Sequence, residues 1–85
     1  MEKPDKHFDF KLYLEAATRH IMIYYGNSEQ ARILVGTYAI ISVLRSEELP
    51  GIISKRTLYR HLEMMSAAGV RFNESYRKEI IRAYS

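Results

Sequence analysis

The sequence predicts a small all-α domain, and three observations support this class. The chain of 85 residues has the length of a single domain, which we place at residues 1–85. Apolar residues recur at steps of three and four, which is the period of amphipathic helices. Capping residues and glycines divide these stretches, and no convincing pair of strands is visible. We therefore expect four helices after a flexible leader at residues 1–8, near residues 9–25, 28–46, 54–68 and 74–84.

The first expected helix begins after Asp9, a suitable N-cap. Its apolar positions lie on one face, which predicts a buried stripe made of Phe10, Leu14, Ala17, Ile21 and Tyr24. Gly26 follows as a C-terminal cap, and Asn27-Ser28 offers the next N-cap.

The second expected helix is apolar almost all round between residues 34 and 44. Such a helix lies either in the centre of a core or in a dimer interface. The predicted inward stripe consists of Ile33, Thr37, Ile40, Ile41 and Leu44. Gly36 lies within it at a cost of about 1 kcal/mol relative to alanine, which suggests a close helix crossing.

Residues 46–53 contain Pro50-Gly51 and are expected to form a turn. Ser54 is a strong N-cap for the third helix, which directs Leu58, Leu62 and Met65 inward and ends at Gly69.

The last helix follows an apolar connector at residues 70–72, which we expect to be extended or strand-like. Asn73 or Ser75 caps this helix. Its spacing predicts a buried stripe of Tyr76, Ile80, Ile81 and Tyr84.

The excess positive charge lies in the last third of the chain. Residues 54–85 carry seven of the thirteen Lys and Arg residues but only three of the ten Asp and Glu residues. This asymmetry is typical of a surface that binds a polyanion. A solvated helix surface with scattered arginines is the alternative explanation.

The third expected helix combines a capped start with basic residues in its first turns. A helix fits the major groove of DNA, and its N-terminal turns are the part that meets base edges and phosphates. Its inward leucines leave an outward face made of Lys55, Arg56, Tyr59, Arg60 and Glu63.

Residues 49–70 resemble the recognition half of helix-turn-helix DNA-binding proteins. The resemblance rests on a small capping residue, two polar residues, Thr, an aliphatic residue, Arg and Leu, which here are Ser54, Lys55-Arg56, Thr57, Leu58, Arg60 and Leu62. The preceding segment departs from that family, because Glu47 and Glu48 stand where the family has small apolar residues, and Pro50 follows them. The resemblance therefore implies a variant with a long turn, and the helix expected after Gly69 argues against a wing.

Residues 50–72 also resemble, more faintly, the C-terminal region of replication-initiation proteins of filamentous phages. In both, a helix with Ser, Arg, Thr, an aromatic residue and Arg leads into a Gly-plus-aliphatic stop. This second resemblance implies an origin in a mobile element.

The expected function is binding of double-stranded DNA by a small transcriptional regulator or a phage or plasmid accessory factor. The candidate DNA-binding residues are Ser54, Lys55, Arg56, Thr57, Tyr59, Arg60, Arg71, Arg77 and Lys78, with capping as the first role of Ser54. A homodimer is expected, because one recognition helix covers few base pairs. The alternative function is a helical interaction module that binds an acidic protein partner.

Several other classes of function are not expected. The chain has no cysteine, and the separations of His7, His20 and His61 match no metal-ligand spacing. No phosphate loop, nucleophile motif or carboxylate pair in a plausible cleft is present, so we expect no enzyme activity, cofactor or small-molecule substrate. No apolar run is long enough to cross a membrane, and we expect a cytoplasmic protein.

Overall fold

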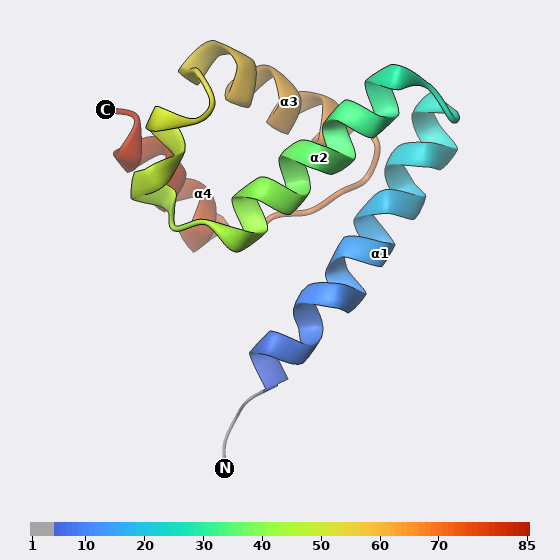
Figure 1. The fold of residues 1–85 in the computed structure, drawn as a ribbon, viewed down its shortest axis with the longest axis horizontal. Coiled ribbons are helices and arrows are strands. Elements are labelled where there is room, and N and C mark those ends of the chain that lie inside the picture. Colours follow the sequence, from blue (N-terminus) through green and yellow to red (C-terminus); the bar gives the residue numbers. More distant parts are fainter. Residues whose placement is uncertain (1–4) are drawn as a thin grey trace.

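The computed structural model describes the backbone of residues 5–85 and the side chains of residues 11–85. Within these residues it contains no strand, and its helices are α1 (Asp5–Tyr25), α2 (Glu29–Val43), the 3-10 helix η1 (Ser46–Gly51), α3 (Lys55–Ala67) and α4 (Glu74–Ala83). The all-α class is therefore confirmed. Figure 1 shows α1 packed against α2, with the N-terminal half of α1 extending beyond the other helices. The molecule measures 39 × 32 × 19 Å along its principal axes.

Helix α1 begins earlier than its capping pattern predicts. Its first residue is Asp5, so Asp9 lies inside the helix and is not its N-cap. Of the leader predicted at residues 1–8, residues 5–8 are helical and residues 1–4 lie outside the described part of the chain. The end of the helix is as predicted, because Gly26 adopts a φ of +75°, which favours glycine.

The buried face of α1 includes Ala17 and Ile21. The prediction for Tyr24 is wrong, since its side chain is 59% exposed. Its neighbour Tyr25 faces the core instead, where its hydroxyl donates a hydrogen bond to the Met64 carbonyl at 2.9 Å. The side chain of Phe10, also predicted to be buried, lies outside the described side chains.

Helix α2 packs against both α1 and α3. Its N-cap is Ser28, whose hydroxyl accepts a hydrogen bond from the Ala31 amide at 3.1 Å. Its fully buried residues are Ala31, Leu34, Thr37 and Ile41. The prediction that Ile33 faces inward is wrong. Apolar residues lie all round this helix, so their spacing does not show which of its sides faces the core. Two small residues, Ala31 and Thr37, lie on the side that the neighbouring helices cover.

Gly36 of α2 does not mark a close helix crossing. A Cβ atom placed on it would meet no atom within 4 Å outside the helix's own backbone. The prediction of a close crossing is therefore wrong, and the helix gains no packing from its glycine.

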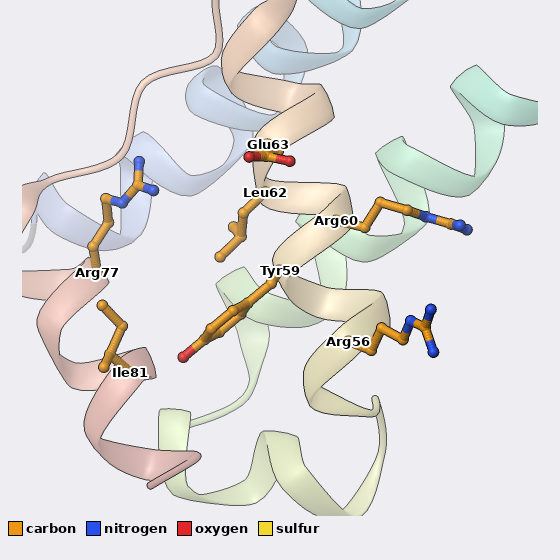
Figure 2. A pocket seen from close by; sticks show the side chains of 7 residues that line it. All are labelled: Arg56, Tyr59, Arg60, Leu62, Glu63, Arg77 and Ile81. Atoms are coloured by element: carbon orange, nitrogen blue, oxygen red, sulfur yellow. The ribbon is translucent and has the colours of Figure 1, made fainter.

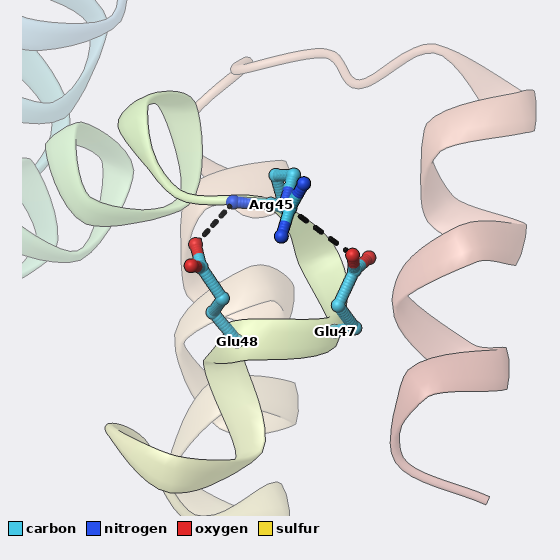
Figure 3. A network of polar contacts seen from close by, with 3 residues as sticks. All are labelled: Arg45, Glu47 and Glu48. Carbon is cyan, nitrogen blue, oxygen red and sulfur yellow. Dashed lines mark hydrogen bonds and ion pairs between the residues drawn. The ribbon is translucent and has the colours of Figure 1, made fainter.

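The segment after α2, predicted as a turn, forms the 3-10 helix η1. Figure 3 shows its start, where the Arg45 amide donates a hydrogen bond to Glu48 Oε1 at 3.0 Å and Arg45 Nε pairs with Glu47 Oε2 at 3.3 Å. Leu49 anchors this segment, since its side chain is completely buried, and α4 packs against η1. The connection from α2 to α3 is therefore long but ordered.

Helix α3 has the predicted cap and the predicted inward face. The Ser54 hydroxyl accepts a hydrogen bond from the Thr57 amide at 3.2 Å, and Leu58, Leu62 and Met65 are buried. Gly69, with a φ of +99°, follows the helix. These residues fix the rotation of α3 about its own axis.

His61 is buried between α3 and α2. Its side chain is only 6% exposed. Its Nδ1 atom shares a hydrogen bond of 2.8 Å with the Thr37 hydroxyl. A buried imidazole needs such a partner.

Helix α4 follows a connector that is extended but pairs with no described strand. Asn73 is the N-cap, and its side chain accepts from the amides of Ser75 and Tyr76. Ile80 is buried, whereas Ile81 is 53% exposed, so the prediction for Ile81 is wrong. The Tyr76 hydroxyl donates a hydrogen bond to the Ile41 carbonyl of α2, and the Tyr84 hydroxyl donates one to the Ile53 carbonyl in the link between η1 and α3.

Candidate nucleic-acid interface

A groove of about 430 Å³ lies between α3 and α4. Figure 2 shows Tyr59 and Leu62 of α3 directed towards α4, from which Ile81 and Arg77 approach. The side chains of Tyr59, Leu62 and Ile81 form the apolar floor of the groove. The charged residues that line it are Arg56, Arg60, Glu63 and Arg77, three basic and one acidic. The groove is thus an apolar floor with a largely basic rim.

Arg56 and Arg60 carry the basic charge on the outer side of α3. Both side chains are exposed, and their spacing of four residues places them one helical turn apart on the same face. Both residues line the groove, and in Figure 2 their guanidinium groups point away from α4. The structure thus places both where a ligand approaching α3 from outside would meet them.

The N-terminal turn of α3 is exposed as well. Ser54 and Lys55 are exposed and Thr57 is half-buried. The Ser54 side chain already accepts from the Thr57 amide, so it serves as the cap of the helix. Other amides of this turn lack partners within the helix and, together with the helix dipole, favour an anion.

Tyr59 is less accessible than we predicted. It is half-buried, and its ring centroid lies 6.2 Å from that of Tyr84. The Lys55 ammonium lies 5.9 Å from the centroid of the same ring. Burial, followed by proximity to Tyr59, raises the pKa of the Tyr84 hydroxyl. Tyr59 therefore supports the contact between α3 and α4 as well as forming part of the groove.

The predicted basic residues of the C-terminal third do not form one cluster. Arg77 lines the groove beside α3. Lys78 is exposed on α4 but does not line this groove, and Arg71 lines two other hollows beside α1 and α2. Arg82 lies beside Glu47 and Glu79 at the junction of α4 with η1. The structure therefore unites Arg56, Tyr59, Arg60 and Arg77 but separates Arg71 from them.

Sequence reasoning missed the apolar floor of the groove. It assigned Ile81 to the core because the residue continues the helical spacing of Tyr76 and Ile80. The low overall hydrophobicity of α4 was the available signal, because a helix with so few apolar residues can cover only a narrow stripe.

The described part of the chain holds no group of three or more His, Asp or Glu side chains arranged to bind a metal ion. None of its helices has both the length and the hydropathy needed to cross a bilayer. Comparison with protein-family models, curated proteins and solved structures finds no match.

Proposed function

We propose that the protein binds double-stranded DNA, with the N-terminal half of α3 in the major groove. One observation carries this proposal: α3 buries one side and exposes the other, and the exposed side carries Arg56 and Arg60. An exposed helix of this kind fits the major groove, where arginine reads guanine or binds phosphate. The capped N-terminus adds amides and a dipole that favour phosphate.

The residues near Arg56 and Arg60 support an approach of DNA to the same side of α3. Arg77 extends the basic surface from α3 to α4. Lys55 and Thr57 belong to the first turn of α3, where helix-turn-helix proteins contact DNA. Glu63, the one acidic residue among the described side chains that line the groove, lies further along α3 and would limit the contact to the first two turns. A regulator or mobile-element accessory factor of this kind would act in the cytoplasm.

A homodimer is part of this proposal, because one helix contacts too few base pairs for useful affinity. The apolar side chains of α2 that we considered for a dimer surface are mostly buried or half-buried within the chain. Ile33 and Val43 of α2 remain exposed, as do Ile23 and Tyr24 near the end of α1. They are the residues with which a second subunit would pack.

The decisive experiment is a titration of labelled duplex DNA, first with a random pool and then with the sequences selected from it. The variant Arg56→Ala plus Arg60→Ala should lower the affinity by about 10-fold or more, since each base contact contributes about 1–3 kcal/mol. It should also reduce the dependence of affinity on salt. The matched control is Lys11→Ala plus Arg19→Ala, which removes the same charge from exposed positions of α1.

Equal losses in these two double variants would show that net charge, rather than the face of α3, attracts DNA. Absence of duplex binding by the parent protein at low salt would contradict the proposal outright, because phosphate attraction is strongest there. A palindromic consensus among the selected sequences would support both specificity and a dimer.

The apolar floor of the groove favours a second candidate function, an interaction module for an acidic protein. Ile81 is 53% exposed and lines the groove together with Tyr59 and Leu62, and a basic rim complements an amphipathic helix with acidic flanks. The variant Ile81→Ser separates the two functions. It should lower the affinity for a protein partner that inserts an apolar side chain into the groove. It should leave the affinity for duplex DNA, which depends on Arg56 and Arg60, unchanged.

A further inference from the structure

A second groove lies on a different part of the molecule, between α1, α2 and the connector that leads to α4. It consists of two adjoining hollows of about 370 and 250 Å³, and both are lined by Tyr13, Tyr38 and Arg71. Phe72 and Tyr76 line the larger hollow. We call this the aromatic groove. Among the described side chains, it shares no lining residue with the groove between α3 and α4.

The connector is held in place along this groove. In Figure 1 it runs from α3 to α4 past α2, on the side of α1. Gly69 begins it with a φ of +99°, and the next residue, Val70, is buried and donates its amide to the Met65 carbonyl at 3.0 Å. Arg71, which follows, is exposed at the edge of both hollows.

The aromatic rings of the groove support one another. The Phe72 ring centroid lies 5.8 Å from that of Tyr38 and 6.5 Å from that of Tyr76. The Tyr76 hydroxyl donates to the Ile41 carbonyl, and its burial, followed by the proximity of Glu79 and Tyr38, raises its pKa to about 12. Tyr13 completes the groove from α1, and its side chain is 60% exposed. A ligand would therefore meet fixed rings on one side and an accessible ring on the other.

The charges around the aromatic groove favour a phosphate-bearing ligand. Arg71 lines both hollows and His20 lines the smaller one, while Ser42 and Asn73 add neutral polar groups. No Asp or Glu occurs among the described side chains that line either hollow. Aromatic side chains stack with the faces of unpaired bases, and an adjacent arginine binds the backbone phosphates. A proline-rich peptide would use the rings but would gain nothing from the arginine.

We propose that the aromatic groove binds unpaired bases of a single-stranded nucleic acid, with Tyr13 stacking on a base and Arg71 contacting a phosphate. This site goes beyond duplex binding by α3 and does not depend on it. A base enclosed in a duplex is stacked on its neighbours and is not available to such a groove, so the two sites select different forms of nucleic acid.

The test is a fluorescence-anisotropy titration of the full chain at low salt with two short labelled probes, an oligothymidylate and an oligouridylate. Tyr13→Ala should weaken binding about 5- to 100-fold, the range of one base–aromatic stack. The matched control is Leu12→Ala, because Leu12 is the neighbour of Tyr13 on the same helix, is 58% exposed, against 60% for Tyr13, and is not among the residues that line either hollow. Arg71→Ala should weaken binding and reduce its salt dependence. Tighter binding of one probe identifies DNA or RNA as the natural strand.

Three results would overturn the proposal. The first is no binding of either probe by the parent protein, including a case in which a proline-rich peptide binds instead. The second is equal affinity of Tyr13→Ala and Leu12→Ala for the probes, with both variants folded as judged by circular dichroism. The third is loss of probe binding in the double variant of Arg56 and Arg60 but not in Tyr13→Ala, which would place the strand on α3.

The same variants distinguish failure of this proposal from failure of the proposed function. Duplex binding that depends on Arg56 and Arg60, without any binding of single strands, would refute the aromatic groove alone. Single-strand binding that depends on Tyr13, without duplex binding, would refute the role of α3 alone.

Discussion

The hydrogen bond between Thr37 and His61 gives a sharp prediction about the packing of α3 on α2. Both side chains are 6% exposed, and their Oγ1 and Nδ1 atoms lie 2.8 Å apart. Thr37→Val keeps the shape of the side chain but leaves the imidazole nitrogen without this partner. An unsatisfied buried polar group costs about 1–3 kcal/mol. For a domain of this size each kcal/mol lowers the melting temperature by about 4–8 °C.

The pH dependence of stability has a definite sign. Burial, and to a smaller extent Arg60, lowers the pKa of His61 below its ordinary value of 6.5. Below pH 6.5 the unfolded chain therefore binds more protons at this residue than the folded chain does. The free energy of unfolding should fall as the pH drops from 6.5 towards the lower folded pKa, by at most about 1.4 kcal/mol per pH unit. Above pH 6.5, His61 is neutral in both states and contributes no pH dependence.

Urea unfolding at pH 7.5 and pH 5.5 measures both effects. The double variant Thr37→Val plus His61→Leu replaces both polar groups, so it should recover most of the stability and lose the part of the pH dependence that His61 contributes. His20→Gln is the control, because that imidazole is exposed. The reasoning is refuted if Thr37→Val unfolds at the same urea concentration as the parent protein. It is also refuted if the double variant keeps the full pH dependence.

Three further substitutions test the ends of helices and one hydrogen bond by thermal unfolding. Gly69→Ala should destabilise by about 1–2 kcal/mol, since its φ is +99° and a Cβ would lie 3.3 Å from the His20 ring; an unchanged melting temperature would contradict this. Ser54→Ala should cost about 1 kcal/mol by removing the cap of α3, whereas a stability gain would argue against that cap. Tyr76→Phe should cost about 1 kcal/mol through its bond to the Ile41 carbonyl, and a neutral result would show that the bond is unimportant.

The sequence predicted those elements whose ends carry a specific residue. Gly26, Ser28, Ser54 and Gly69 each have a local conformation or a side-chain bond that marks a helix boundary, and all four lie where we expected. The start of α1 was misplaced because a capping residue such as Asp9 is also tolerated inside a helix. Local signals therefore fix boundaries only when the alternative conformation is costly.

The rotation of the helices was harder to predict than their ends. In α3, polar and apolar residues lie on opposite faces of the helix, and Leu58 and Leu62 are buried as expected. In α2 the apolar residues lie almost all round the helix between residues 34 and 44, so spacing could not decide between Ile33 and Leu34. The burial of His61 depends on Thr37 from another helix, and no single-helix pattern reveals such a pairing. Whether such a side chain is buried therefore depends on how the helices pack against one another.

The two candidate sites differ in how far the sequence could predict them. One depends on a single helix, and the other depends on segments that are distant in the sequence. The exposure of Arg56 and Arg60 follows from α3 alone, and the sequence was sufficient for it. The aromatic groove brings together Tyr13, Tyr38 and Arg71 from three separate segments, so only the folded chain could show it. Arg71 was predicted to join the basic surface of α3 because its charge was read without its place in the fold.

The arrangement of α3 makes its binding role separable from its structural role. Substituting exposed residues such as Arg56 and Arg60 usually changes stability by less than about 0.5 kcal/mol, so a loss of DNA affinity in that variant would reflect lost contacts. Thr37→Val has the opposite character, because it touches no proposed ligand and acts only through the seating of α3 on α2. If it weakened duplex binding under conditions where the protein remains folded, the orientation of α3 on α2, and not its arginines alone, would set the affinity.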